Sequence, residues 1–343
     1  MPTHVEGTVL RGPDFDPVEG RVVVEDGRIA DVEETTTDST DIVCPAFVNA
    51  HTHIGDSIAK EAGGGLSLEE LVAPPDGLKH RLLRAADPDE LIEGMRRSLS
   101  FMQAGGTAAC IEFREGGVDG VRHIERAADG LAIDPVVLGR ETVEAMHASD
   151  GFGASGANDA TFDAEREETR EAGKLFGIHA GEVDDSDIGP ALDLDPDFLV
   201  HLVHADADHL DRIAEMEIPA AVCPRSNLVT DVGLPPVEDL LDHTDVALGT
   251  DNVMLNSPSM FREMEFTAKL YDVTAREVLG MATRAGADVA GLNCGLIEEG
   301  RDAKLLVLDG DSDNLAGAQD VVRAVVRRAG VSDVKDVALE SAD

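Results

Sequence analysis

Short apolar segments typical of β-strands alternate with amphipathic helical segments through most of this 343-residue chain. Helical spacing is clearest in residues 89–104, where Ile92, Met95, Leu99 and Met102 fall on one face. Such alternation over about 250 residues predicts a parallel sheet, and that length favours a closed (β/α)8 barrel. The expected strands are residues 42–48, 107–113, 135–139, 175–179, 198–203, 218–223 and 245–250, with an eighth in the glycine-rich segment 150–155.

Both ends of the chain predict further short strands outside this barrel. Residues 21–25 and 28–32 flank Asp26-Gly27, a dipeptide typical of a tight hairpin turn. Near the other end, residues 304–309 and 321–326 are apolar and rich in valine and leucine, and we expect strands there too. The expected domains are a small composite β-sandwich, residues 1–44 and 296–343, and the (β/α)8 barrel, residues 45–295.

The charge of the chain excludes some partners. Asp and Glu outnumber Lys and Arg by 69 to 28, which gives a formal net charge of −41. Such a surface repels phosphates, so we expect no nucleic acid and no membrane as partners. Two explanations of the charge stand: cationic partners, or halophilic adaptation, in which excess carboxylates keep the surface hydrated at high salt. Acids spread along the whole chain, together with only six lysines, favour the halophilic explanation.

Other sequence features predict an ordinary cytoplasmic protein. No apolar segment approaches the ~20 residues that span a bilayer, and the first residues do not resemble a signal peptide. The stretch 63–77 is expected to be a lid, an oligomer contact or an ordinary long loop, and we expect a homo-oligomer. Four widely spaced cysteines predict buried thiols instead of disulfides or a zinc knot: Cys44, Cys110, Cys223 and Cys294.

Residues that can bind a metal occur where several predicted strands end. His51 and His53 lie two apart on one strand, so both side chains point to the same face. His179, His201 and Asp251 end three further strands. The C-terminal strand ends of a barrel form one face, where active sites lie. Histidines and a carboxylate with one open position are typical of a catalytic site for Zn²⁺ or a similar divalent ion, with Fe²⁺ as the alternative.

At these positions the chain resembles the amidohydrolase superfamily, most of all its cytosine deaminase, chlorohydrolase and adenosine deaminase-like branch. The segments that carry the resemblance are 45–53 (PAFVNAHTH), 179–182 (HAGE), His201, 224–227 (PRSN), 249–252 (GTDN) and 295–303 (GLIEEGRDA). The resemblance implies that one divalent metal ion is bound by four residues: His51, His53, His179 and Asp251. In such a site the metal lowers the pKa of bound water and makes a hydroxide nucleophile.

The resemblance also implies roles for residues around the metal. Glu182 follows His179 by three residues and would carry a proton from the water to a ring nitrogen and the leaving amine. His201 would polarise the attacking hydroxide or stabilise the developing charge, and Asp251 would also accept a proton from the water. His204 competes with His201, but the spacing of 26 residues between His201 and Asn227 favours His201.

Three further residues are expected to bind the substrate: Glu112, Arg114 and Asn227. Glu112 could instead be an extra metal ligand. Because binuclear members of the superfamily use a lysine on the fourth strand, and residues 150–160 contain none, we expect a single metal ion.

Three functions remain open from the sequence. The first is a hydrolytic deaminase of a small amino-substituted heterocycle such as a purine, pyrimidine or pterin. The second is an amidase, cyclic-amide hydrolase or chlorohydrolase on the same scaffold. The third is a scaffold without catalysis, which the presence of every expected ligand disfavours.

Overall fold

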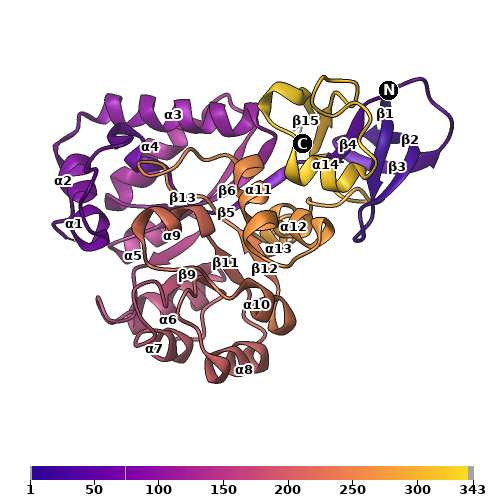
Figure 1. The fold of residues 1–343 in the computed structure, drawn as a ribbon. Coiled ribbons are helices and arrows are strands. Elements are labelled where there is room, and N and C mark those ends of the chain that lie inside the picture. Colours follow the sequence, from indigo (N-terminus) through magenta and orange to yellow (C-terminus); the bar gives the residue numbers. More distant parts are fainter. Residues whose placement is uncertain (1, 74, 339–343) are drawn as a thin grey trace.

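The computed structural model describes residues 2–73 and 75–338, and these residues form two hydrogen-bonded sheets (Figure 1). The smaller sheet lies at one end of the molecule and combines strands from both ends of the chain. Its strands, in spatial order, are β15 (Val334–Ala338), β14 (Leu305–Leu308), β4 (Ile42–Pro45), β1 (Thr3–Arg11), β2 (Asp16–Glu25) and β3 (Arg28–Glu34).

The predicted hairpin is confirmed. Strands β2 and β3 pair antiparallel up to Glu25 and Arg28. The two turn residues between them, Asp26 and Gly27, have φ angles of 49° and 72°. Two consecutive left-handed residues are what a tight type I′ hairpin turn requires, and Asp-Gly adopts that conformation at low cost.

The prediction of a strand at 321–326 is wrong, because this segment forms helix α14 (Val321–Arg327). The Asp320 side chain accepts a hydrogen bond from the Arg323 amide and so caps the helix. Val322, Val325 and Val326 are buried on one face, and the helix packs against α11 (Met260–Leu270) and α12 (Ala275–Ala282). The expected sandwich of two facing sheets is not confirmed, since the terminal strands belong to one six-stranded sheet.

The larger sheet is parallel throughout and confirms the predicted α/β architecture. Its spatial order is β12 (Val246–Leu248), β11 (Ala220–Val222), β10 (Phe198–His201), β9 (Leu175–Ala180), β8 (Gly151–Ala154), β7 (Asp134–Gly139), β6 (Thr107–Arg114), β5 (Phe47–His53) and β13 (Asp251–Asn252). Only Gly249 and Thr250 separate β12 from β13 in the chain, so the sheet curls until its two edges lie together. The glycine-rich segment near residue 150 is a strand, as predicted.

One expected strand is divided between the two sheets. The sequence predicts a single strand over 42–48, whereas β4 ends at Pro45 and β5 begins at Phe47. The amide of Ala46, between them, donates to the carbonyl of Lys304 next to β14. The chain therefore passes from the smaller sheet to the larger one within a single apolar run, which apolar patterning cannot reveal.

Helices lie around the larger sheet and connect its strands (Figure 1). They are α1 (Leu68–Val72), α2 (Leu78–Ala85), α3 (Pro88–Ala104), α4 (Gly117–Ala128), α5 (Val143–His147), α6 (Asp163–Ala172), α7 (Ile188–Asp193), α8 (Ala207–Met216), α9 (Pro224–Thr230), α10 (Val237–His243) and α13 (Arg284–Val289), with a short 3-10 helix at Ile54–Ala59. A second 3-10 helix, Val331–Asp333, precedes β15 of the smaller sheet. The predicted helix at 89–104 is α3, with Asp87 as its N-cap and Pro88 in its first turn.

The core and the cysteines agree with the sequence predictions. Strand side chains such as Phe113, Phe176 and Phe198 are fully buried in the larger sheet. All four cysteines are buried and free. Within residues 2–73 and 75–338, no helix has the length and apolar character needed to cross a membrane.

Candidate active site

The five side chains that the sequence placed at strand ends converge in one cluster. Two groups can each hold a metal ion, His51 with His53 and His179, and His51 with His201 and Asp251, with ligand atoms within 4.8 Å of one another. His51 Nε2 lies 3.3 Å from Asp251 Oδ1, and His53 Nε2 lies 3.7 Å from the same oxygen. The parallel register explains this convergence, because β5, β9, β10 and β13 all present their C-terminal ends at one face.

Local contacts hold Asp251 beside His51. The Asn49 side chain donates to Thr250 Oγ1 at 2.8 Å and accepts from the Thr250 amide at 3.0 Å, which ties β5 to the segment before β13. A Cβ at Gly249 would lie 2.7 Å from the Cβ of His51. Only glycine therefore allows the two chain segments to approach so closely.

Backbone strain occurs at two residues of the cluster. His201 and Asp251 have φ angles of 78° and 57°, in the left-handed region that non-glycine residues rarely adopt. Each such residue costs of order ~1 kcal/mol or more and persists only where its surroundings hold it. The fold thus imposes these two conformations, which turn both side chains into the cluster.

The hydrogen bonds of the histidines indicate that a cation fits between them. His53 Nδ1 faces two acceptors, the Phe113 carbonyl at 3.2 Å and Glu115 Oε1 at 2.9 Å, so this nitrogen carries the proton. His179 Nδ1 donates to the Ala154 carbonyl at 2.7 Å. The lone pairs on the two Nε2 atoms therefore face each other across 3.3 Å.

The two facing lone pairs repel each other, and protonation of either nitrogen does not relieve this repulsion. Burial, followed by the nearby Lys79 charge, lowers the pKa of His53 to about 3, and burial lowers the pKa of His179 well below its usual value. His51 is fully buried and neither of its ring nitrogens makes a hydrogen bond. A divalent metal ion would satisfy all three imidazoles. His53 and His179, each with its other ring nitrogen facing a protein acceptor, have the arrangement that is common among histidine metal ligands.

Asp251 is held as a carboxylate. Burial alone would raise its pKa, but the adjacent imidazoles, His51 first, hold the pKa of Asp251 well below its usual range. Ser226 Oγ donates to Asp251 Oδ2 at 2.6 Å, and Asn252 Nδ2 donates to Oδ1 at 2.9 Å. Asp251 can therefore serve as an anionic metal ligand.

Glu182 lies at the opening of the cluster, opposite His201. Its Oε2 is 3.5 Å from His201 Nε2, and its side chain is 20% exposed. Asn227 Nδ2 lies 3.3 Å from His201 Nδ1; with the amide nitrogen donating, the proton of neutral His201 is on Nε2, toward Glu182. Burial raises the pKa of Glu182. His204 is exposed and outside the cluster, so the structure favours His201.

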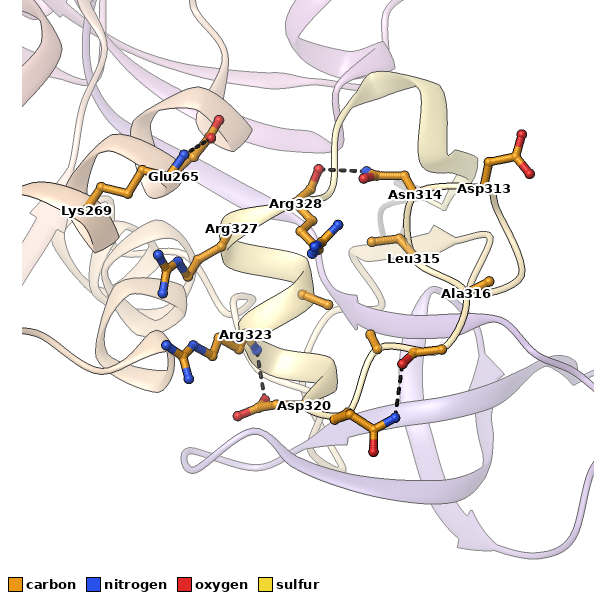
Figure 2. A pocket seen from close by; sticks show the side chains of 14 residues that line it. Glu265, Lys269, Asp313, Asn314, Leu315, Ala316, Asp320, Arg323, Arg327 and Arg328 are labelled. Atoms are coloured by element: carbon orange, nitrogen blue, oxygen red, sulfur yellow. Dashed lines mark hydrogen bonds and ion pairs between the residues drawn. The ribbon is translucent and has the colours of Figure 1, made fainter.

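A cavity of about 630 Å³ opens above these residues. His53, His179, Glu182, His201 and Asp251 form its floor, and Ser67–Ala73 with α1 forms part of its wall. A larger hollow, about 880 Å³, lies between α11 and α14 (Figure 2), where Arg323 and Arg327 extend from the same side of the helix. It contains none of the metal-ligand candidates, so chemistry, and not size, identifies the smaller cavity as the candidate active site.

Comparison with known proteins agrees with this site. The sequence model of the amidohydrolase family matches residues 42–195 and 163–335. A protein of Methanothermobacter thermautotrophicus, provisionally named an aminohydrolase, is 37% identical over 347 residues, covering 88% of this chain and 90% of its own length. The chain belongs to the amidohydrolase family.

Two other proteins are also similar to this amidohydrolase. A 5-methylthioadenosine/S-adenosylhomocysteine deaminase of Haloarcula marismortui is 28% identical, over 92% of this chain and 83% of that protein. A solved adenosine deaminase from Xanthomonas campestris with bound zinc has the same fold, with a TM-score of 0.83 at 20% identity over 97% of this chain and 90% of its own. The family resemblance that the sequence indicated is confirmed.

The three residues predicted to bind substrate lie behind the cavity. Glu112 is fully buried and accepts from Thr52 Oγ1 at 2.9 Å and from the Ile54 amide at 2.7 Å. Arg114 and Asn227 are also buried, and none of the three is among the residues that line the cavity. Glu112 also lies outside both metal-ligand groups. They contact residues next to the candidate metal ligands or behind them, such as Thr52 and His201, and direct contact with a substrate stays a prediction.

Several residues of the site escaped the sequence analysis. Glu115 contacts His53, and Lys79 and Arg140 both contact Glu115 and line the cavity. These are common charged residues without a recognisable spacing. Ser226, in the PRSN segment, is a donor to Asp251, and the resemblance of that segment was the one signal that could have identified it.

Proposed function

We propose that this amidohydrolase is a metal-dependent deaminase, which hydrolyses a C–N bond of a small amino-substituted heterocycle and releases ammonia. The observation that carries the proposal is the position of Glu182. Its carboxylate lies three residues past His179, at the mouth of the metal-ligand cluster and 3.5 Å from His201 Nε2. Replacing a ring amine by oxygen requires a group that moves protons at such a position. Deaminase activity among the relatives supports the same reaction.

The ligand set supports one divalent metal ion, which we propose to be zinc, with iron(II) as the alternative. His51, His53, His179 and Asp251 would hold it, and zinc bound in a deaminase of the same fold supports that choice. When bound, such an ion supplies Lewis acidity and makes water nucleophilic near neutral pH.

Side chains of the protein would carry out the remaining steps, which are proton transfer and stabilisation of the developing charge. Glu182 accepts a proton from the attacking water and passes it to the ring nitrogen; it then takes the second proton from the added hydroxyl and passes it to the departing amine, which leaves as ammonia. His201, with its proton on Nε2, donates to the negative charge that develops on the attacked group, and Asn227 fixes this tautomer. The imidazoles beside Asp251, His51 first, hold the pKa of its carboxyl low against the effect of burial, so it stays ionised as a ligand.

The cavity supports a small-molecule substrate. Its volume of about 630 Å³ is within the range of ligand sites and accommodates a heterocycle with a substituent. The charge of −41 argues against nucleic acid as substrate. A homo-oligomer and halophilic life in the cytoplasm remain part of this proposal.

An ammonia-release screen tests the function. The zinc-loaded protein, in molar KCl, is offered purines, pyrimidines and pterins with a ring amine, including adenosine, 5-methylthioadenosine and S-adenosylhomocysteine. We expect ammonia from at least one of them, and none from the metal-depleted protein or from His179→Ala. Chloride release from a chlorotriazine, or ring opening of a cyclic amide, without ammonia from any amine would replace the deaminase by the alternative hydrolases.

A further inference from the structure

One wall of the active-site cavity carries positive charge in an otherwise strongly acidic protein. Lys79, at the start of α2, and Arg140, directly after β7, both line the cavity. Lys79 is one of six lysines in the chain and is only 2% exposed. A buried cation requires a reason, because burial of a charge is costly unless a partner compensates it.

Glu115 compensates only part of this charge. Its Oε1 lies 2.6 Å from Lys79 Nζ, 3.2 Å from Arg140 Nη1 and 2.9 Å from His53 Nδ1. Arg114 adds a further cation 3.7 Å from Oε2, and the other carboxylate of this wall, Glu112, lies 4.0 Å from Arg114. Glu112 and Glu115 are the two carboxylates in ion-pair contact with these three cations. Buried Asp56, and Glu182 and Asp251 in the cavity lining, carry further carboxyl groups near Lys79, and the bound metal ion would offset part of their charge.

Hydrogen-bond donors remain available on both cationic side chains. Lys79 Nζ has three donors and contacts Glu115 and, at 3.1 Å, Asn252 Oδ1. The Arg140 guanidinium has five donors, and Glu115 is its one side-chain partner among residues 2–73 and 75–338. The acids that share the cavity lining on its outer side, Glu69 and Asp159, are exposed and therefore screened by water.

We propose that Lys79 and Arg140 form a subsite for an anionic group of the substrate, a carboxylate or a phosphate. The substrate would then be an amino-heterocycle that carries such a group, held with its ring toward Glu182. The inference rests on the proposed deaminase function. The competing explanation is that this charged cluster only orients His53. For that role the Glu115 carboxylate would be enough, and two further cations at the edge of the cavity would not be needed.

Matched pairs of ligands test the subsite without relying on turnover. Titration calorimetry on the zinc-loaded protein compares deamination products that differ by one anionic group: inosine with inosine 5′-monophosphate and with inosine-5′-carboxylic acid, and uridine with uridine 5′-monophosphate. In at least one pair we expect the anionic member to bind about 10- to 100-fold more tightly, the effect typical of a hydrogen bond between charged groups. Comparing the phosphate with the carboxylate identifies which anion the subsite takes.

Variants of Arg140 test whether the preference for the anionic ligand comes from the cavity wall that Lys79 and Arg140 form. Arg140→Gln should reduce the ratio of anionic to neutral affinity about tenfold or more, and Arg140→Lys should retain part of it. Arg122→Gln, which removes an equal charge from an exposed position on α4, should leave the ratio unchanged. If no pair shows a preference, or if Arg140→Gln and Arg122→Gln behave alike, the subsite is refuted.

The same variants separate this proposal from the function on which it rests. For each pair of amines that correspond to these products, kcat/KM is measured by ammonia release. Ammonia released equally from neutral and anionic amines would leave the deaminase standing and overturn the subsite. Anionic products that bind in an Arg140-dependent manner, with no ammonia from any amine, would uphold the subsite and overturn the deaminase.

Discussion

Replacing Glu182 by glutamine isolates proton transfer from metal binding. The two side chains have the same shape, so the cavity and its floor should be preserved, while glutamine cannot accept and return a proton. Glu182 belongs to neither metal-ligand group, and its carboxylate is at the opening of the cluster, 20% exposed. We therefore expect Glu182→Gln to fold and bind metal as the unaltered protein does.

The expected loss of activity follows from the role of the carboxylate. General acid–base catalysis contributes ~10²–10⁴-fold, which corresponds to about 2.7–5.4 kcal/mol of transition-state stabilisation at about 1.36 kcal/mol per factor of ten. The loss should appear in kcat, because the proton moves only after substrate has bound. His201, 3.5 Å away, cannot replace Glu182, since its own proton already faces the same point.

The assay combines kcat for ammonia release with metal content by mass spectrometry. The matched control is Asp185→Asn, which removes one negative charge from an exposed position in the same loop. The control should keep full turnover and metal. The reasoning is refuted if Glu182→Gln turns over within a few-fold of the unaltered enzyme, or if it loses metal, which would make Glu182 a ligand or a structural acid.

Three further predictions concern the metal, salt and pH. Metal analysis should find one divalent ion per chain and none in His179→Ala; two ions would contradict the mononuclear site and make Glu112 a ligand. The melting temperature should rise with KCl well beyond ~0.1 M, where the Debye length is already about 10 Å, since the charge is −41; equal melting temperatures in dilute buffer and molar KCl would exclude halophilic adaptation. Burial raises the pKa of Glu263 to about 7, although the charge of Arg225 opposes this shift. Folding therefore favours the protonated form of Glu263, and the stability that this contributes is fully present below the unfolded pKa and is lost as the pH rises through about 7. By denaturant unfolding, the stability of the unaltered protein relative to Glu263→Gln should fall by about 2–3 kcal/mol between pH 5 and 8, and a constant difference would show that the folded pKa is not raised.

Local patterns in the sequence were sufficient for the parallel α/β architecture. Strand and helix differ in the period of their apolar residues, and each period is visible within about ten residues. The convergence of His51, His53, His179, His201 and Asp251 was also predictable. Each of them lies at or just after the C-terminal end of a predicted strand, and topology alone brings the C-terminal ends of parallel strands to one face.

Other features were decided by contacts between residues far apart in the chain. The valine-rich segment at 321–327 has the composition of a strand, yet its packing against α11 and α12 and the Asp320 cap make it a helix. The passage between sheets at Ala46 depends on a hydrogen bond with Lys304, more than 250 residues away. Neither contact can be recognised from the residues that lie close by in the sequence.

The charged wall of the cavity depends most on tertiary structure. Lys79, Glu115 and Arg140 come from α2, the end of β6 and the end of β7, and as single residues they are indistinguishable from the surface charges around them. Their burial against His53 changes what they can do, because a charge interacts far more strongly where water is excluded. The sequence determined the architecture and the strand-end ligands through local periodicity, whereas only the folded chain could bring these three charges together beside the cavity.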